Sequence, residues 1–290
     1  MIKNYLSLIK FSHTIFAMPF AVIGFFLGTS SPTLLLQEKG VNSQIHLFIM
    51  VILCMIFARS AAMAFNRWAD NKYDKENVRT KIREIPSGII SAGNALAFVI
   101  INCVLFIATT FFINSICFYL SPVALIIILG YSYTKRFTPL CHLILGLGLS
   151  LAPIGAFLAV TGEFKLLPLL YSFVVLFWVS GFDIIYALQD EEFDRSQNLK
   201  SIPVLLGKKN ALLFSRILHI ISASIVLYAG YMAGFHLWYW IGSGLFISLL
   251  IYQHTLVKPN DLSKVTLAFA TTNGIASVVF ASFFLMEMFL

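Results

Sequence analysis

Two short acidic motifs lie at the ends of strongly apolar segments of this chain. The first contains Asn66, Asp70 and Asp74, and the second runs from Asp183 to Asp194. Only 13 residues are acidic and only 11% are charged, so two such clusters are unusual in this composition. Carboxylates gathered at the edge of apolar segments indicate a divalent metal and the phosphates that the metal would hold.

The spacing within each motif places its polar groups on one helical face, because residues three or four apart on a helix are neighbours. Asn66, Asp70 and Asp74 follow one another at intervals of four. The second motif has a similar face, made of Asp183, Tyr186, Asp190 and Asp194. If the two segments face each other, about four carboxylates converge on one cavity.

Converging carboxylates repel one another unless cations lie between them. Magnesium prefers hard oxygen ligands, and one or two carboxylates commonly hold it together with substrate phosphates. We therefore expect the two motifs to hold magnesium that bridges a diphosphate. The expected magnesium ligands are Asn66, Asp70, Asp74, Asp190 and Asp194.

Basic residues follow the acidic motifs, which suits a diphosphate better than a bare metal store. Arginine makes bidentate contacts with phosphate, and lysine supplies a point charge. Each basic residue alone is also explained as a determinant of membrane topology. The candidates are Arg67, Lys72, Arg79, Lys81 and Arg83 after the first motif, Lys135 and Arg136 after Tyr131, and Arg195 and Lys200 after the second motif.

Arg59 and Asp183 lie inside apolar segments, where an ionisable group is costly and indicates function. Arg59 precedes Asn66 by seven residues, so it lies on the same helical face, roughly 10 Å deeper. Two interpretations follow. Arg59 forms a structural ion pair with Asp183, or it binds an acidic acceptor below the diphosphate.

The elements that position these residues are predicted to be membrane-spanning helices. Of the 290 residues 59% are hydrophobic, and the mean hydropathy is +0.87. A helix crosses a bilayer with roughly 20 apolar residues, and lipid requires that backbone polar groups be satisfied within the helix. We predict nine spans, at about residues 11–36, 45–66, 92–113, 116–134, 139–160, 166–189, 211–233, 235–257 and 265–289.

Basic residues are distributed unevenly across these spans. All but three of the 20 Lys and Arg residues lie on the side that holds the N-terminus and the loops after even-numbered spans. Positive charge marks the cytoplasmic side. We therefore predict a multi-pass protein of the inner (cytoplasmic) membrane, with cytoplasmic N-terminus and acidic motifs and the C-terminus opposite. This topology explains the net charge of +7 without a nucleic-acid partner.

The four cysteines and six histidines show no metal-ligand spacing. Each cysteine lies in or at the end of an apolar segment, and none forms a C-x-x-C pair. We interpret the cysteines as buried hydrophobic residues and the histidines as packing or interfacial residues.

Together the motifs resemble those of the UbiA superfamily of intramembrane aromatic prenyltransferases, along most of the chain. The first motif is similar to the family's N-x-x-x-D-x-x-x-D, and the second to D-x-x-Y-A-x-x-D-x-x-x-D. Tyr131 and Lys135 match a Y-x-x-x-K element. Ser201-Ile202-Pro203-Val204 and Gly207 match the stretch that follows the second motif.

The resemblance implies one polytopic domain over residues 1–290, with nine transmembrane helices around a central cavity that opens to the cytoplasmic side. Magnesium would bind a polyprenyl diphosphate, and the prenyl chain would leave through a lateral opening into the bilayer. The acceptor would be a small aromatic acid such as 4-hydroxybenzoate, and the product a precursor of a respiratory quinone.

In that reaction, metal and basic groups neutralise the leaving diphosphate, and the allylic cation attacks a ring carbon ortho to a phenolic hydroxyl. Asp183 and Asp190 are both candidates to polarise the phenol or take a proton. The expected catalytic residues are Asp70, Asp74, Asp183, Asp190 and Asp194. The expected substrate-binding residues are Arg59, Asn66, Arg67, Lys72, Arg79, Arg83, Tyr131, Lys135 and Tyr186.

Two departures from the family pattern leave the acceptor open. Glu84 stands where proline is common, and Arg67 stands where many members have aspartate. Residues 135–142 and 181–195 are closest to a subgroup placed in menaquinone synthesis through futalosine, whose acceptor would be 1,4-dihydroxy-6-naphthoate.

Two other classes of protein share some of these sequence features. A cation-coupled transporter would also have intramembrane charges, but its site is expected near the midplane rather than at one face. A magnesium-binding assembly protein without catalysis would have no need of the basic residues around the acids.

Overall fold

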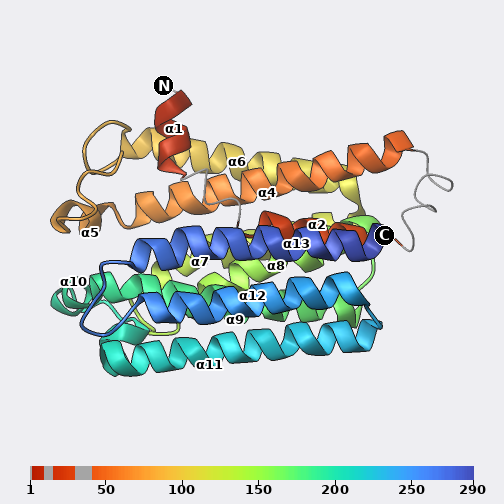
Figure 1. Cartoon of the computed structure of the whole chain (residues 1–290). Helices are drawn as coiled ribbons and strands as arrows, with labels where there is room; N and C mark the ends of the chain where they lie inside the picture. The colour runs from red at the N-terminus through yellow and green to blue at the C-terminus, as the bar shows by residue number, and fades with distance from the viewer. Residues whose placement is uncertain (1, 10–15, 30–40) are drawn as a thin grey trace.

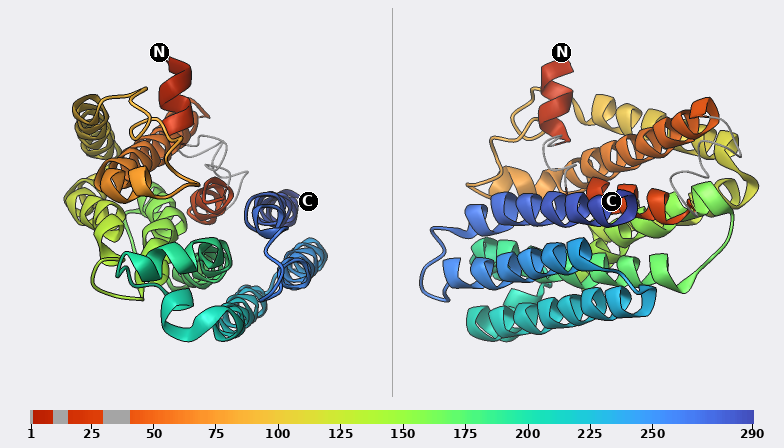
Figure 2. Two further views of the ribbon diagram at one scale, coloured as in Figure 1. Left: turned by 90° about the vertical axis from the view of Figure 1, so that its left-hand side faces the viewer. Right: turned by 45° about the vertical axis from the view of Figure 1, so that its right-hand side comes forward.

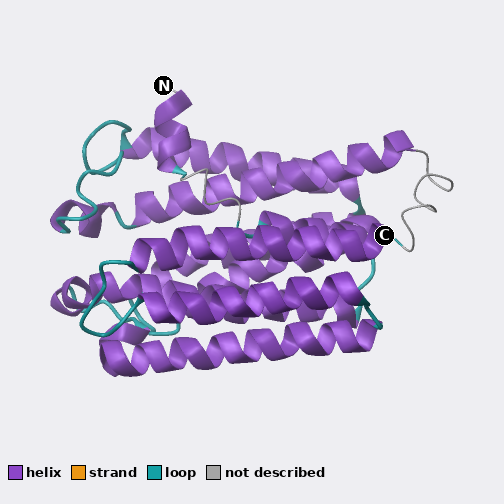
Figure 3. Cartoon of the chain, viewed as in Figure 1, coloured by secondary structure: helices purple, strands orange, loops and turns teal. Residues whose placement is uncertain are grey.

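The protein is described by a computed structural model that covers residues 2–9, 16–29 and 41–290. Within these residues all regular structure is helical, and a single isolated bridge joins Lys258 and Asp261. Figure 3 shows the helices running alongside one another in a bundle. The predicted all-helical architecture is confirmed.

Seven of the described helical segments are long and apolar enough to cross a membrane. They are formed by α4 (Val41–Ala69), α6 (Ala92–Ile113), α7 (Ser115–Thr134), α8 (Cys141–Thr161), α9 (Leu166–Ala187), α11 (Ile202–Ala233), and the π-helix η3 (Leu267–Thr272) with α13 (Asn273–Phe289). Helix α12 (Leu237–Leu256) coincides with the eighth predicted span but is less apolar, since it carries Gln253 and His254.

The N-terminal helices are shorter. Helix α2 (Met18–Leu27) lies within the predicted first span. Residues 10–15 and 30–40, on either side of it, lie outside the described part of the chain. It packs against α8 and α13. Helix α1 (Ile2–Leu8) packs on α4.

Helix α11 starts at Ile202, well before the predicted start at residue 211. The Ser201 hydroxyl caps it by accepting from the Val204 amide, and Pro203 lies in its first turn. Proline suits this position because the first-turn amides have no partner within the helix. Gly207 breaks the helix after this turn with a φ of 73°, which glycine adopts without steric cost.

The helices close into a ring. Neighbours in the chain pack side by side from α4 and α6 through to α12 and α13, and α13 and α4 both contact α2. The end-on view in Figure 2 shows this arrangement. Two short helices, α5 (Asn71–Glu76) and α10 (Glu191–Ser196), lie at the same end of the bundle (Figure 1). The ring therefore brings both acidic motifs to one end.

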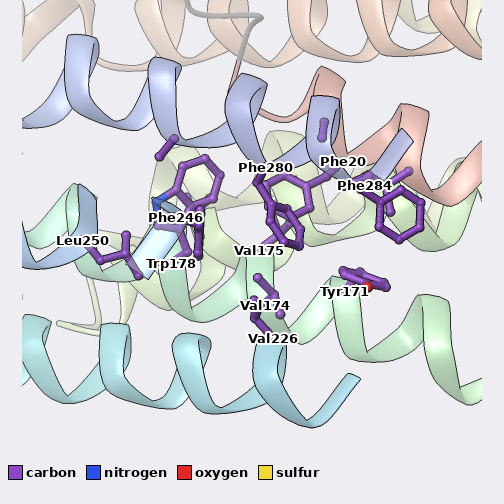
Figure 4. Close-up of a cluster of buried hydrophobic side chains, with 14 of the residues drawn as sticks. Phe20, Tyr171, Val174, Val175, Trp178, Val226, Phe246, Leu250, Phe280 and Phe284 are labelled. Atoms are coloured by element: carbon purple, nitrogen blue, oxygen red, sulfur yellow. The ribbon is translucent and has the colours of Figure 1, made fainter. Parts of the chain in front are cut away.

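Aromatic side chains fill the part of the ring made by α2, α9, α12 and α13 (Figure 4). Phe20, Trp178, Phe246 and Phe280 are buried there, with neighbouring ring centroids 5.4 to 6.5 Å apart. The indole nitrogen of Trp178 donates to Asn273 Oδ1 at 2.8 Å, which satisfies a polar group that lipid could not. This half of the bundle is a packed core.

Helices α8 and α9 approach closely at Gly146. A Cβ there would contact the Ser180 hydroxyl and lie 2.5 Å from the Leu176 carbonyl oxygen. That oxygen cannot move without shifting α9, so we expect Gly146→Ala to destabilise the fold by roughly 1–3 kcal/mol. Thermal unfolding in detergent would measure this. Gly155→Ala on the same helix is the control, since no described atom lies within 4 Å of its added Cβ. Equal melting temperatures would contradict the packing argument.

Candidate active site

Both acidic motifs lie where a long helix gives way to a short one. Helix α4 ends at Ala69, and Asp70 caps the short helix α5, which contains Asp74. The second motif begins in α9, passes through the 3₁₀ turn η2 (Leu188–Asp190) and ends in α10 with Asp194. The common face predicted for the first motif is confirmed, because the Asp70 amide donates to the Asn66 carbonyl oxygen at 2.9 Å and the Asp74 amide to that of Asp70 at 2.8 Å. The Asn66 side chain also donates to Asp70 Oδ2 at 3.2 Å.

Arginines from the loop after α5 hold two of the carboxylates. Arg83 Nη1 lies 2.7 and 2.9 Å from the two oxygens of Asp74. Arg79 binds Asp190 in a bidentate way, with Nε at 3.1 Å from Oδ1 and Nη2 at 2.5 Å from Oδ2. Because Asp190 belongs to the second motif, the Arg79 pair ties the two motifs together.

Tyr186 supports the same arginine. Its hydroxyl accepts from Arg79 Nη1 at 3.1 Å, and the guanidinium lies 5.5 Å from the ring centroid. The ring of Phe269, in η3, packs on the ring of Tyr186, with the two centroids 4.2 Å apart. The Asp190 carboxylate raises the pKa of Arg79 despite the opposing effect of burial. Arg79 is therefore cationic and held in place.

Lys135 joins a third segment to the site. Its Nζ lies 2.6 Å from Oδ1 of Asp194, a residue with no exposed surface. Burial lowers the pKa of Lys135, but Asp194, together with Asp190 and Asp70, raises it above its usual value overall. Lys135 therefore lies within electrostatic range of acids from both motifs, as a diphosphate-binding lysine would.

Asp70 is the most weakly paired of these acids. It accepts from Asn66 Nδ2 at 3.2 Å, and Arg136 Nη2 lies 3.6 Å from its Oδ1. Burial raises the pKa of Asp70 to about 6, while Lys135 and Arg136 oppose the shift. Arg136 donates to the Ala69 carbonyl oxygen at 2.7 Å, so the backbone positions it. The sequence names Arg136 only as one of the basic residues suited to a diphosphate, and the structure adds its contact with Asp70.

Asp183 has a histidine partner. His142 Nδ1 lies 2.7 Å from Asp183 Oδ2. The structural ion pair between Arg59 and Asp183, one of the two interpretations of the sequence, is not formed among the described residues. The interpretation of His142 as a packing residue missed this contact, because α8 and α9 bring the two residues together from 41 positions apart.

An apolar cavity of about 380 Å³ lies between α4, α6, α7 and α8. Arg59 and Tyr131 are among its lining residues. Tyr131 also lies within electrostatic range of Asp70, Asp183 and Arg67. The cavity therefore extends into the bundle from below the acidic motifs.

Arg67 is buried and Arg59 is half-buried, and both have buried donors that are unused. Among the described residues, neither Nε of Arg59 nor Nε and Nη1 of Arg67 has a hydrogen-bond partner. A buried guanidinium without a partner is costly. Two of them beside Tyr131 therefore indicate an anionic ligand. Lys72, by contrast, is exposed and forms no ion pair within the described part of the chain.

No group of three or more His, Cys, Asp or Glu residues that could hold a metal occurs among the described residues. Each motif carboxylate instead pairs with a basic side chain of the protein. The donor set of the motifs, four carboxylates and the Asn66 amide, nevertheless has the hard oxygen chemistry that magnesium prefers. Binding the metal would require the acids to exchange their present partners.

Comparison with known proteins identifies the family. The model of the UbiA prenyltransferase family matches residues 17–284. The 4-hydroxybenzoate octaprenyltransferase of Nitrosomonas eutropha is 31% identical over 243 residues, which cover 82% of this chain and 83% of that protein.

Solved structures share the fold. The apo UbiA homolog from Aeropyrum pernix K1 is 30% identical, has a TM-score of 0.83, and the match covers 95% of this chain and 98% of that one. The UbiA homolog from Archaeoglobus fulgidus bound to GPP and Mg2+ is 22% identical with a TM-score of 0.74, and the match covers 98% and 99%. With its two acidic motifs and apolar spans, the chain belongs to the UbiA prenyltransferase family and is a multi-pass integral membrane prenyltransferase.

Proposed function

We propose that the protein transfers a polyprenyl group from a polyprenyl diphosphate to a small aromatic acid, in respiratory quinone biosynthesis. The expected acceptor is 4-hydroxybenzoate, the substrate in the name of the relative from Nitrosomonas eutropha. The observation that carries the proposal is an apolar cavity lined by Arg59 and by Tyr131, which is within electrostatic range of Asp70, Asp183 and Arg67.

The cavity suits a prenyl donor because its two ends differ in chemistry. Its lining is apolar along α4, α7 and α8, which favours a hydrocarbon chain. Arg79, Arg83 and Lys135 supply cations for the diphosphate. Arg67 adds a buried guanidinium with free donors. In this arrangement the chain lies within the bundle and the diphosphate lies among the motifs.

Magnesium would be held by Asn66, Asp70, Asp74, Asp190 and Asp194. When bound, it would neutralise charge on the departing diphosphate. Each of the four acids is paired with a cation that phosphate oxygens would also attract. The diphosphate would bind these cations, and the carboxylates released from them would be free to bind the metal.

Arg59 is the candidate for the acceptor's carboxylate. It lines the cavity with Tyr131 and lies two turns deeper than Asn66 on α4. A benzoate held there would place its ring between Arg59 and the diphosphate, within reach of the prenyl carbon. The same position would accept a naphthoate, so 1,4-dihydroxy-6-naphthoate is the alternative acceptor.

The membrane arrangement follows from the same proposal. We infer a single domain over residues 1–290 with nine transmembrane helices, in which α2 and α12 join the seven apolar segments. The basic loops at the motif end would face the cytoplasm. The cavity would open to that side of the inner membrane, and the C-terminus would lie on the opposite side.

Prenyl transfer in membranes that contain the protein tests the proposal. With magnesium and a long polyprenyl diphosphate, we expect a prenylated product from 4-hydroxybenzoate. Product from 1,4-dihydroxy-6-naphthoate alone would change the acceptor and keep the reaction. Membranes without the protein are the control. No product from either acceptor, with folded protein present, would contradict the proposed function.

A further inference from the structure

Asp183 differs from the other four motif acids in the partner that holds it. Asp74 and Asp190 each have both oxygens bound by an arginine, and Asp194 is fully buried against Lys135. Asp70 accepts from Asn66 and lies near Arg136. At each of these four sites an arginine or lysine therefore competes for the carboxylate.

Only one oxygen of Asp183 is engaged by the described residues. Its Oδ2 lies 2.7 Å from His142 Nδ1, while Oδ1 has no hydrogen-bond partner among them. The Asp183 side chain is 21% exposed, whereas that of His142 is 4% exposed. The Asp183 side chain is therefore more accessible than that of His142.

Asp183 and His142 are not among the residues that line the cavity, but both are close to residues that do. Asp183 is within electrostatic range of Tyr131, which lines it. His142 is in the first turn of α8, on the same helical face as Leu145 and Leu149, which line the cavity as well. The proposed function places the acceptor ring near Arg59 and Tyr131, and Asp183 is on the Tyr131 side of that position.

The hydrogen bonds of His142 distinguish it from a histidine that only packs in the core. Its Nε2 is buried and has no partner within the described residues. The other deeply buried histidine, His219, bonds at both ring nitrogens, to His254 at 2.8 Å and to the Trp178 carbonyl oxygen at 3.1 Å. A histidine that serves packing satisfies both nitrogens, as His219 does. In His142, Nδ1 contacts Asp183 at 2.7 Å and Nε2 has no such partner.

We propose that His142 is a positioning residue for the acceptor reaction, which holds Asp183 by Oδ2 and leaves Oδ1 to take the acceptor's proton. The inference rests on the proposed function. The prenyl C–O bond breaks, and its electron pair leaves with the diphosphate. A C–C bond forms to the ring carbon, the C–H bond there breaks, its electron pair returns to the ring, and the proton passes to Asp183 Oδ1.

Two substitutions at His142 separate positioning from packing. The amide nitrogen of asparagine can take the place of Nδ1 and donate to Asp183, whereas that of glutamine lies nearer the place of Nε2. We expect His142→Gln and Asp183→Asn each to lower kcat for transfer by about 10²-fold. His142→Asn should retain most of the rate. The KM for the polyprenyl diphosphate should stay unchanged in all three.

A second readout isolates the donor half of the reaction. Without acceptor, slow hydrolysis of the polyprenyl diphosphate involves no removal of a proton from an aromatic ring. His142→Gln should therefore leave the rate of this hydrolysis at the wild-type value. The double variant His142→Gln with Asp183→Asn should lose no more than Asp183→Asn alone, because coupled residues are not additive.

The outcomes are distinct. Equal transfer by wild type and His142→Gln would overturn the positioning role, as would equal losses in the Asn and Gln variants. A parallel loss of donor hydrolysis would assign His142 to the fold and overturn it too. If wild type hydrolyses the donor but transfers to no acceptor, both this inference and the proposed function fail. If the wild type and all the variants transfer at the same rate, only this inference is overturned and the proposed function stands.

Discussion

Asp194→Asn should reduce prenyl transfer by at least about 10²-fold while the protein still inserts and folds. Asp194 has no exposed surface, and its charge pairs with Lys135 at 2.6 Å. Asparagine keeps the shape of the side chain but removes the charge that a metal would need. It also leaves Lys135 without its carboxylate. Transfer rates in membranes, normalised to the amount of protein, would measure the effect.

The first motif should respond in the same way. Asp70→Ala removes a carboxylate that Asn66 and Arg136 approach from the other side of the site, so we expect a comparable loss. Glu192→Ala is the matched control within the second motif. Its side chain is 93% exposed and lies 3.8 Å from Lys208, away from the other acids. Activity in the double variant Asp70→Ala with Asp194→Asn would disprove a role for the motifs in catalysis.

Removing divalent metal should reduce transfer to background. Four of the motif acids are each paired with one cation in the structure, so a diphosphate that binds those cations would leave the acids unpaired. A diphosphate alone would add negative charge to a site that already contains five carboxylates. Magnesium restores the balance, because hard carboxylate oxygens bind it readily. We therefore expect EDTA to abolish transfer and added magnesium to restore it.

EDTA already saturated with magnesium is the control for effects of the chelator on the membrane. Full activity in free EDTA would show that the protein's own cations suffice for the diphosphate. The metal sites assigned to Asn66, Asp70, Asp74, Asp190 and Asp194 would then be wrong. The expected loss and the Asp194→Asn loss should not add, since both remove the same metal.

Much of the fold follows from local sequence properties. The boundaries of α6, α7 and α8 lie close to the predicted spans, because hydropathy over about 20 residues depends only on neighbouring residues. Local spacing also predicted correctly that Asn66 and Asp70 share a face, since the two side chains are hydrogen-bonded at 3.2 Å. It did not predict that α4 ends at Ala69, where Arg136 from another helix end binds the carbonyl oxygen.

The candidate site shows the same division. The sequence was sufficient to select Asp74, Arg83 and Lys135 as members of one charged site, because charge is rare in an apolar chain. It was not sufficient to pair them. A carboxylate meets several cations within reach, and which one it binds depends on how helices far apart in the chain are packed.

By itself, the sequence determined that this is a helical membrane protein with two acidic motifs, because composition and spacing are properties of neighbouring residues. The tertiary structure decided the rest: that Arg79 crosses to Asp190, that His142 rather than Arg59 binds Asp183, and that the apolar cavity lies beside Tyr131. These contacts join residues from different helices. Their geometry is set by the packing of the whole ring, which no local pattern encodes.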